Sequence, residues 1–179
     1  WKKYLGPLGA KKARIQSGWA KTEKTPGTYD WAWLDEIIPD MAAQGVEPWV
    51  CICYGNPIYA GGGGTGLGGG LPTSEEALAA WDRYVAALAN RYKRHVNEWE
   101  IWNEPNIYPE WGEQAVDPVA YTEMLRIAYE RAKEADPNVY VVAAPLAVTL
   151  GEPHPEPGKW RSMPDLDYLE AMYEAGASE

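Results

Sequence analysis

The sequence predicts an α/β fold, and within that class a partial (β/α)8 barrel, in which a cylinder of parallel strands is surrounded by helices. Three observations predict it. Apolar runs of strand length alternate with amphipathic runs of helix length, and this order requires right-handed crossovers between parallel strands. The connections that leave the strands are long and rich in polar and aromatic residues, whereas those that enter them are short. The chain has 179 residues, while a complete barrel needs about 250.

We therefore expect a single domain over residues 1–179 that contains about half of a barrel. A doubly wound sheet is the competing architecture, and it would place a glycine-rich turn directly between a strand and a helix. Eight of the ten residues 61–70 are glycine, but they lie in a long loop. They lack both the G-x-G-x-x-G spacing and the Lys-Ser/Thr pair of a phosphate loop, so we expect a flexible loop there.

The first half of the chain contains two predicted strands and a helix between them. Residues 12–16 form a short strand. Asp30 can cap a helix over residues 30–45, where apolar residues recur at i, i+3 and i+4. Pro39 lies inside this helix and should kink it. Residues 47–54 form a near-continuous apolar run, as expected for a strand that is covered on both faces.

A long helix follows the glycine-rich loop. Thr73 and Glu76 have the spacing of a capping box, which predicts a helix that starts there and ends at about Val96.

The second half repeats the strand–helix order. Residues 99–102 form a strand, and Asp117 is the expected N-cap of a helix over residues 117–135. The Val-rich residues 139–144 form a further strand. A long Pro-rich loop then leads to a last amphipathic helix over residues 165–175.

Both ends of the chain predict an internal fragment. The first residue is Trp1, and residues 1–9 resemble the tail of a helix, whereas residues 175–179 resemble a helix C-cap. The absence of a signal peptide therefore leaves the localisation undetermined.

Composition and charge exclude several classes of function. The chain has 26 acidic and 16 basic residues, a formal net charge of −10. No cluster of Lys or Arg offsets this charge, so we expect no binding to nucleic acid. The apolar runs are far shorter than the roughly 18 residues that cross a membrane, so no membrane partner is expected.

Cysteine and histidine give no metal or redox motif. Cys51 and Cys53 would share one strand face with nearly parallel side chains, which disfavours a disulfide between them. His95 and His154 show no metal-ligand spacing, so no metal or other cofactor is expected. The 10 Trp and 12 Tyr residues, against no Phe, suit both a core and the stacking of sugars.

The most reactive group predicted for this fold is a carboxyl at a strand end. Asn103 and Glu104 directly follow the strand at residues 99–102, and catalytic groups of barrels project from these ends. Partial burial beside an amide and aromatic walls suits a general acid. Glu104 could instead be an ordinary loop carboxylate, and Asn103 could simply cap the turn.

Two segments carry a resemblance to a known family. Residues 99–106, with Asn-Glu-Pro at their centre, resemble the end of the fourth strand in clan A glycoside hydrolases. Residues 18–31 resemble the turn after the second strand of that clan, with its Trp, Glu, Pro-Gly and Tyr-Asp landmarks. Together with residues 34–35 and 45–48, the pattern is most similar to family 39, the β-xylosidase-like group. The resemblance covers about residues 9–176 and implies that the chain contains about strands two to five of the barrel.

The resemblance implies roles for individual residues. Glu104 matches the acid/base of the family, and Asn103 matches the amide that binds the 2-hydroxyl of the sugar. The nucleophilic Glu of the clan ends the seventh strand, beyond Glu179. Arg14 matches an arginine near that nucleophile, but it could equally pair with a carboxylate such as Glu100 inside the barrel. By position, four further residues are candidates to line the sugar site: Trp19, Tyr54, Asn56 and Trp102. For the two Trp residues, packing in the core is an equal alternative.

The sequence thus predicts a retaining O-glycoside hydrolase that acts on β-linked sugars, as xylosidases and glucosidases do. Its substrate would be an oligo- or polysaccharide, and Glu104 would act in a double displacement. Residues 1–179 alone are expected to be inactive, because the nucleophile lies outside them. The alternative is a non-catalytic carbohydrate-binding barrel, and a weaker one is a barrel enzyme acting on sugar phosphates.

Overall fold

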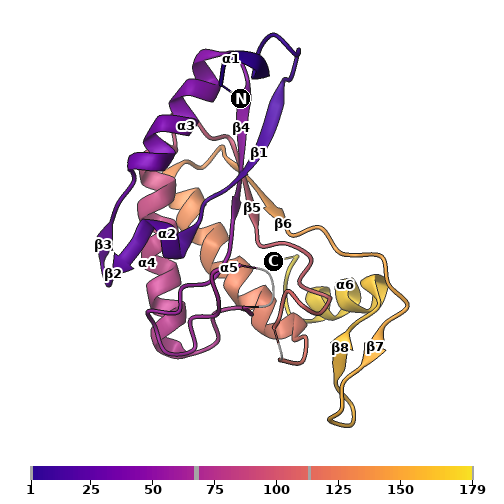
Figure 1. Ribbon diagram of the computed structural model, residues 1–179. Coiled ribbons are helices and arrows are strands. Elements are labelled where there is room, and N and C mark those ends of the chain that lie inside the picture. Colours follow the sequence, from indigo (N-terminus) through magenta and orange to yellow (C-terminus); the bar gives the residue numbers. More distant parts are fainter. Residues whose placement is uncertain (1, 67–68, 113, 179) are drawn as a thin grey trace.

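Figure 1 shows the computed structural model, which describes residues 2–66, 69–112 and 114–178. Its helices are α1 (Lys2–Leu5), α2 (Trp19–Thr22), α3 (Ala32–Ala43), α4 (Glu75–Tyr92), α5 (Pro118–Ala135) and α6 (Asp165–Glu174). Its strands are β1 (Lys12–Gln16), β2 (Glu23–Thr25), β3 (Thr28–Tyr29), β4 (Glu47–Ile52), β5 (Glu98–Ile101), β6 (Tyr140–Ala143), β7 (Glu152–Pro153) and β8 (Trp160–Ser162).

The main sheet is parallel, with the strand order β1-β4-β5-β6. Its register pairs Gln16 with Cys51, Cys51 with Glu100, and Glu100 with Val142. The helices α3, α4 and α5 lie on one side of this sheet (Figure 1). The order of neighbouring strands follows the chain, which is the progression of a barrel wall. The predicted strand–helix alternation and the parallel sheet are confirmed.

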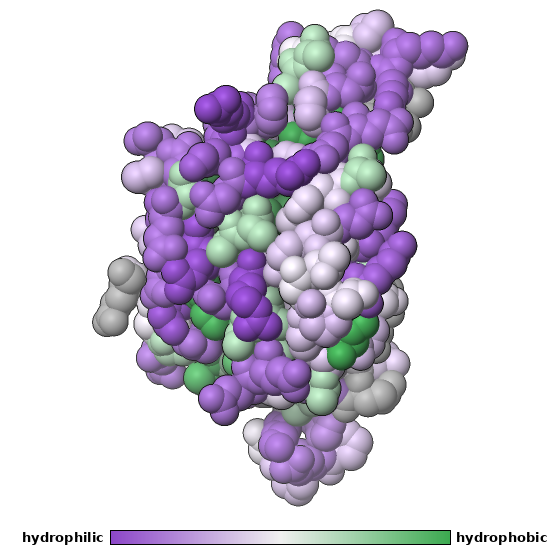
Figure 2. Space-filling model, turned by 90° about the vertical axis from the view of Figure 1, so that its left-hand side faces the viewer, coloured by the Kyte–Doolittle hydropathy of each residue, from purple (hydrophilic) through white to green (hydrophobic). Residues whose placement is uncertain are grey.

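The helices are amphipathic and turn their apolar sides toward the sheet. Tyr84 and Leu88 of α4 are fully buried, at the spacing of one helical turn. Figure 2 views the side of the molecule that carries α3 and α4, and this surface is mostly hydrophilic with scattered hydrophobic residues. The core therefore lies between the helices and the sheet.

The start of α4 differs from the prediction by one residue. Ser74 is the N-cap, and its side-chain oxygen accepts a hydrogen bond from the backbone N–H of Ala77 at 3.1 Å. Thr73 is exposed and does not cap. Two adjacent hydroxyl residues precede this helix, and the tertiary turn decides which one reaches the free N–H groups. The helix ends at Tyr92, earlier than the predicted Val96.

Two other predicted helix starts have different outcomes. Asp117 caps α5, and its carboxylate accepts from the N–H groups of Val119 and Ala120. The N-cap position of α3 is Trp31, one residue after the expected Asp30, although Asp30 still accepts from the N–H of Ala32 at 3.1 Å.

The glycine-rich loop folds back on itself. A Cβ on Gly62 would lie 2.1 Å from the carbonyl oxygen of Asn56, and one on Gly64 would lie 2.3 Å from the Cα of Gly69. No side chain fits at such distances. These glycines therefore allow close backbone packing in the described parts of the loop, residues 61–66 and 69–70. The predicted flexible loop also includes residues 67–68, which lie outside the described residues.

The face of the sheet opposite the helices carries ion pairs. Side chains two residues apart on a strand share a face, so Lys12 and Arg14 point to the same side. Lys12 contacts Glu98, and Arg14 pairs with Glu100, whose side chain is 1% exposed. These pairs form two charged layers below the ends of the strands.

Cys51 and Cys53 are buried free thiols with their sulfur atoms 3.4 Å apart. None of the helices in the described ranges combines the length and the apolar composition that crossing a membrane requires.

Candidate active site

The candidate site lies at the carboxyl end of β5, where the backbone is strained on both sides of Asn103. Trp102 has φ 73° and Glu104 has φ 39°. These are the only non-glycine residues with positive φ in the part of the chain that the structure describes. Such conformations cost about 1–3 kcal/mol each and concentrate at functional sites. The turn after β5 therefore holds two non-glycine residues in an energetically costly conformation.

Glu104 is held at this end of the sheet by its backbone. Its N–H donates to the carbonyl of Pro145 at 3.1 Å, and its own carbonyl accepts from the N–H of Ile107 at 3.2 Å. The first bond joins the loop after β5 to the segment after β6. Glu104 is half-buried, so part of its surface stays exposed at this end of the sheet.

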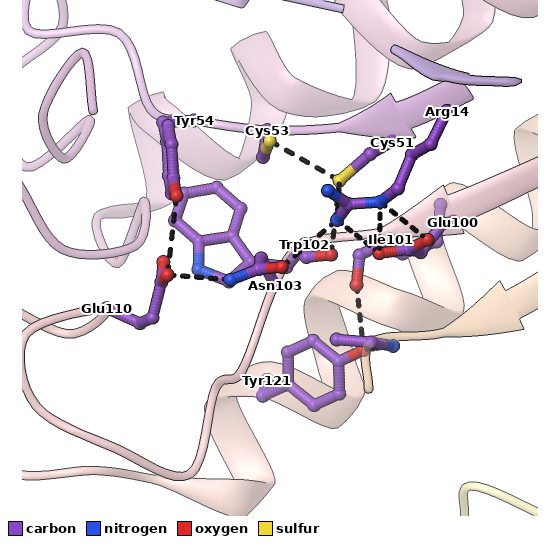
Figure 3. A network of polar contacts seen from close by, with 11 residues as sticks. Arg14, Cys51, Cys53, Tyr54, Glu100, Ile101, Trp102, Asn103, Glu110 and Tyr121 are labelled. Atoms are coloured by element: carbon purple, nitrogen blue, oxygen red, sulfur yellow. Dashed lines mark hydrogen bonds and ion pairs between the residues drawn. The ribbon is translucent and has the colours of Figure 1, made fainter. Parts of the chain in front are cut away.

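The side-chain amide of Asn103 has a defined orientation. Its oxygen accepts from Nη2 of Arg14 at 3.0 Å, and its nitrogen donates to Oε1 of Glu110 at 2.8 Å (Figure 3). Arginine can only donate and an ionised carboxylate can only accept, so these partners identify the oxygen and the nitrogen of the amide. One hydrogen of the amide group remains for another acceptor.

Arg14 joins the charged layer of the sheet to this amide. Its Nε lies 3.0 Å from Oε2 of Glu100, and its Nη2 lies 2.5 Å from Oε1 (Figure 3). The hydrogen bonds to Glu100 raise the pKa of the guanidinium further above its ordinary value. Nη2 also contacts the sulfur of Cys51 at 3.2 Å. Arg14 thus forms the pair with Glu100 that the sequence allows, and its place near the nucleophile of the family stays a prediction.

The sequence gives little indication of one further carboxylate in the site, Glu110. It lies in the loop between β5 and α5 and is 1% exposed. Its Oε1 accepts from Asn103 and from the phenol of Tyr54 at 3.3 Å. Burial raises the pKa of Glu110, and the charge of Glu104 raises it further, whereas the hydrogen bonds from Asn103 and Tyr54 oppose the shift.

Tyr54, whose position after β4 predicts that it lines the sugar site, lies against Trp102 and Glu110. Its ring packs edge-on against Trp102, with 5.5 Å between the ring centres and 87° between the planes. Burial raises the pKa of its phenol well above the ordinary range, so the hydroxyl is a hydrogen-bond donor. Beside it lies a cavity of about 270 Å³. The cavity is lined by Gly18, Trp19, Ala20, Lys21, Tyr54, Gly55 and Thr65.

Both tryptophans that were candidates to stack on a sugar are core residues. Trp19 borders the cavity but has no exposed surface, because its ring stacks with Tyr59 and Tyr84 at 5.9 and 5.6 Å. Trp102 is also fully buried, edge-on to Tyr54 and Trp81. The packing alternative therefore replaces the prediction that these rings contact the substrate.

Asn56 is a structural residue too, contrary to the prediction. It is fully buried. Its nitrogen donates to the carbonyl of Glu23 at 2.8 Å, and its oxygen accepts from the N–H of Ile58 at 3.2 Å. Both ends of the amide are thus used by the backbone of neighbouring loops.

Asn106 is the last residue of the sequence motif at residues 99–106, and the sequence alone predicts no separate role for it. It is fully buried, and its nitrogen donates to the carbonyls of Ala147 at 2.8 Å and Met163 at 3.1 Å. Its oxygen accepts from the N–H of Ala147 at 2.9 Å. One side chain therefore joins the loop after β5 to the two segments that follow β6.

The chain is similar in fold to solved glycoside hydrolases. One is a family 39 glycoside hydrolase from Bacteroides cellulosilyticus WH2, at 23% identity and a TM-score of 0.63 over 79% of this chain. A monomeric β-xylosidase from Caulobacter crescentus CB15 matches 78% of the chain at 22% identity and a TM-score of 0.60. A β-glucosidase from Exiguobacterium marinum matches 83% at 16% identity and a TM-score of 0.61. No family model and no curated protein matches the chain.

These similarities show the fold. The chain spans 27%, 31% and 36% of the lengths of the three structures, in the order given. The similar structures are (β/α)8 barrels, and the four parallel strands of this chain, in sequential order, correspond to part of such a barrel. The predicted partial barrel is confirmed.

Proposed function

We infer that this chain forms part of the catalytic barrel of a retaining glycoside hydrolase that acts on β-linked sugars, with Glu104 as the acid/base. The observation that carries this proposal is the position of Asn103 and Glu104. They follow an internal strand of a parallel sheet whose fold is that of glycoside hydrolase barrels. The half-buried carboxyl group lies at the end of the strands where barrel enzymes bind their substrates.

In the first step of the proposed reaction, Glu104 gives its proton to the glycosidic oxygen as the bond between this oxygen and the anomeric carbon breaks. A carboxylate nucleophile from another strand of the complete barrel forms an ester with that carbon. In the second step the Glu104 carboxylate takes a proton from water, the water oxygen attacks the anomeric carbon, and the ester bond breaks. Glu104 is then protonated again.

The surroundings of Glu104 support the acid role. Glu104 is half-buried at the strand ends, and the effect of its charge on Glu110 shows that the two carboxyl groups are neighbours. Asn103 contributes its remaining N–H, which suits a hydrogen bond to a sugar hydroxyl.

Two of the similar solved structures are a β-xylosidase and a β-glucosidase. We extend these activities to this chain as part of the proposal, so the substrates to test are β-xylosides and β-glucosides. An aryl glycoside with a good leaving group needs little proton donation, whereas an unactivated disaccharide needs it fully.

The test uses the full-length protein that contains this chain. Glu104→Gln should lower kcat on an unactivated β-linked disaccharide by about 10²–10⁴-fold. On the aryl glycoside the ester should form but break down slowly, and added azide should restore turnover by attacking the anomeric carbon in place of water.

The matched control is Glu170→Gln, since Glu170 is an exposed carboxylate on α6 outside the site. This variant should keep the wild-type rates. Near-full activity of Glu104→Gln on the disaccharide would refute the role of Glu104. Saturable binding of a sugar without turnover by the wild type would favour the non-catalytic carbohydrate-binding barrel.

A further inference from the structure

Glu110 is an unusual group to bury in this loop. The residue is 1% exposed, and its Oε2 has no hydrogen-bond partner in the part of the chain that the structure describes. An unpaired buried carboxylate oxygen lowers stability, and native proteins retain few such groups. Packing alone does not explain this residue, because an apolar side chain would fill the same space without that penalty.

A second buried carboxylate shows what a purely structural role looks like. Glu23 is also 1% exposed, but both of its oxygens accept hydrogen bonds. The donors are Trp19 Nε1 at 2.5 Å, the N–H of Gly27 at 2.6 Å and the hydroxyl of Tyr59 at 2.6 Å. These bonds join α2, the β2–β3 turn and the loop after β4, so Glu23 holds together segments of the fold.

Both donors to Glu110 belong to the candidate active site instead. Figure 3 shows the Asn103 amide and the Tyr54 phenol meeting at the same oxygen of Glu110. The amide oxygen of Asn103 is held from the other side by Arg14 at 3.0 Å. Asn103 is therefore fixed at both ends, directly before Glu104 in the sequence.

We propose that Glu110 is a positioning residue of this site, whose carboxylate holds the amide of Asn103 and the phenol of Tyr54 in one orientation beside Glu104. The proposal rests on the proposed function for its effect on the reaction. Glu110 does not touch the substrate, because it is buried behind the two side chains that it holds. Its effect on a glycoside should therefore pass through Asn103.

A specificity measurement separates this role from a general structural one. The family resemblance assigns the amide of Asn103 to the 2-hydroxyl of the sugar, and one N–H of this amide is left free. A 2-deoxy glycoside lacks the group that the oriented amide would bind. The readout is the ratio of kcat/KM for an aryl β-glycoside to that for its 2-deoxy analogue.

Glu110→Leu in the full-length protein should lower this ratio by about tenfold or more, which corresponds to about 1.4 kcal/mol of transition-state stabilisation. Glu110→Gln keeps an acceptor oxygen for Asn103 and Tyr54, so it should lose less than Glu110→Leu. Leu88→Ala is the control, since Leu88 is fully buried in α4 away from the site. It should lower stability and leave the ratio unchanged.

A double-mutant cycle tests whether Glu110 acts through its neighbour. Asn103→Ala should lower the ratio by itself, and adding Glu110→Leu to it should change the ratio by less than about twofold. Fully additive losses would overturn the proposal, and so would a Glu110→Leu variant that keeps the wild-type ratio.

The side-chain amide resonances of Asn103 give a readout that needs no activity. In protein labelled with 15N-asparagine, the resonances absent from Asn103→Ala identify this group. They should move in Glu110→Leu and stay in place in Leu88→Ala. If the wild type hydrolyses no glycoside but these shifts occur, the proposed function fails and the positioning of Asn103 stands. If the wild type is active and the resonances ignore Glu110→Leu, the positioning role is wrong.

Discussion

At the scale of single residues, the site depends on side chains that restrain one another. Glu100 holds the guanidinium of Arg14, Arg14 holds the oxygen of Asn103, and Glu110 holds its nitrogen. Each of these side chains is fully or partly removed from water, and this burial strengthens the hydrogen bonds between them. The same burial means that the loss of one partner leaves a buried polar or charged group unpaired, which lowers the stability of the folded state. We therefore expect mutations in this network to affect geometry and stability together.

The raised pKa of Glu110 predicts how stability depends on pH. The pKa of Glu110 is higher in the folded state than its ordinary value of 4.5, which applies to the unfolded state. At a pH between the unfolded-state pKa and the folded-state pKa, the folded protein therefore binds more protons than the unfolded one. Stability contributed by this group is present below pH 4.5 and falls as the pH rises through the folded-state pKa. Glu110→Gln lacks this titration.

The melting temperature of Glu110→Gln should therefore rise relative to the wild type as the pH increases from about 4 to 8. Calorimetry across this pH range measures the difference, and Glu170→Gln serves as the exposed control. A difference that stays constant, or that shrinks with increasing pH, would show that Glu110 is not destabilised by its burial.

At the scale of elements, a helix cap and a buried side-chain amide hold the loops after β5 and β6 in place. Asp117 ends the loop after β5 by capping α5, and Asn106 fastens that loop to the carbonyl groups of Ala147 and Met163. The loop after β4 is fastened in the same way, because Ser74 both caps α4 and donates to the carbonyl of Ala60 at 2.5 Å. The loops that follow the strands are thus held to one another and to the helices by polar side chains.

The N-cap of α4 gives a test with a control one residue away. Ser74→Ala should lower the free energy of unfolding by about 1 kcal/mol, because an N–H group at the start of the helix loses its acceptor. Thr73→Ala should change it by less than about 0.5 kcal/mol, since Thr73 is exposed and makes no cap. Denaturant titration measures both. Equal effects of the two substitutions would mean that the cap is shared between the residues.

At the scale of the whole molecule, the sheet ends at two parallel edges. β1 and β6 are the outer strands. On β6, Tyr140 is 69% exposed and Val142 is 39% exposed. The register places Val142 beside Glu100 on the face that no helix covers. An open edge with exposed apolar side chains can pair with another chain.

A polypeptide of residues 1–179 should therefore self-associate. It should also hydrolyse no glycoside, because the proposed reaction takes its nucleophile from another strand of the complete barrel. Sedimentation velocity over a concentration series measures the association. Replacing Tyr140 and Val142 with Lys should shift the distribution toward the monomer, because charge on an edge strand opposes pairing. The paired control is Lys substitution at Tyr129 and Tyr173, exposed residues on α5 and α6. A wild-type segment that remains monomeric throughout, or that turns over a glycoside, would contradict this prediction.

The local sequence pattern was sufficient to predict the helices and strands and to locate the end of β5. Apolar runs and helical spacing predicted the strand–helix order, because burial on one or two faces imposes a period that can be read along the chain. Asp117 was a readable cap, because its partners are only two and three residues away. Asn103 and Glu104 could be placed at a strand end for the same reason.

Contacts between distant residues were decided only by the tertiary structure. Tyr54 and Glu110 are 56 positions apart, and Arg14 and Asn103 are 89 apart. They meet because parallel crossovers bring the ends of β1, β4 and β5 to one edge, and nothing local encodes that distance. The rings of Trp19 and Trp102 show the same limit, since an aromatic residue after a strand has the same pattern whether a sugar or the core covers it.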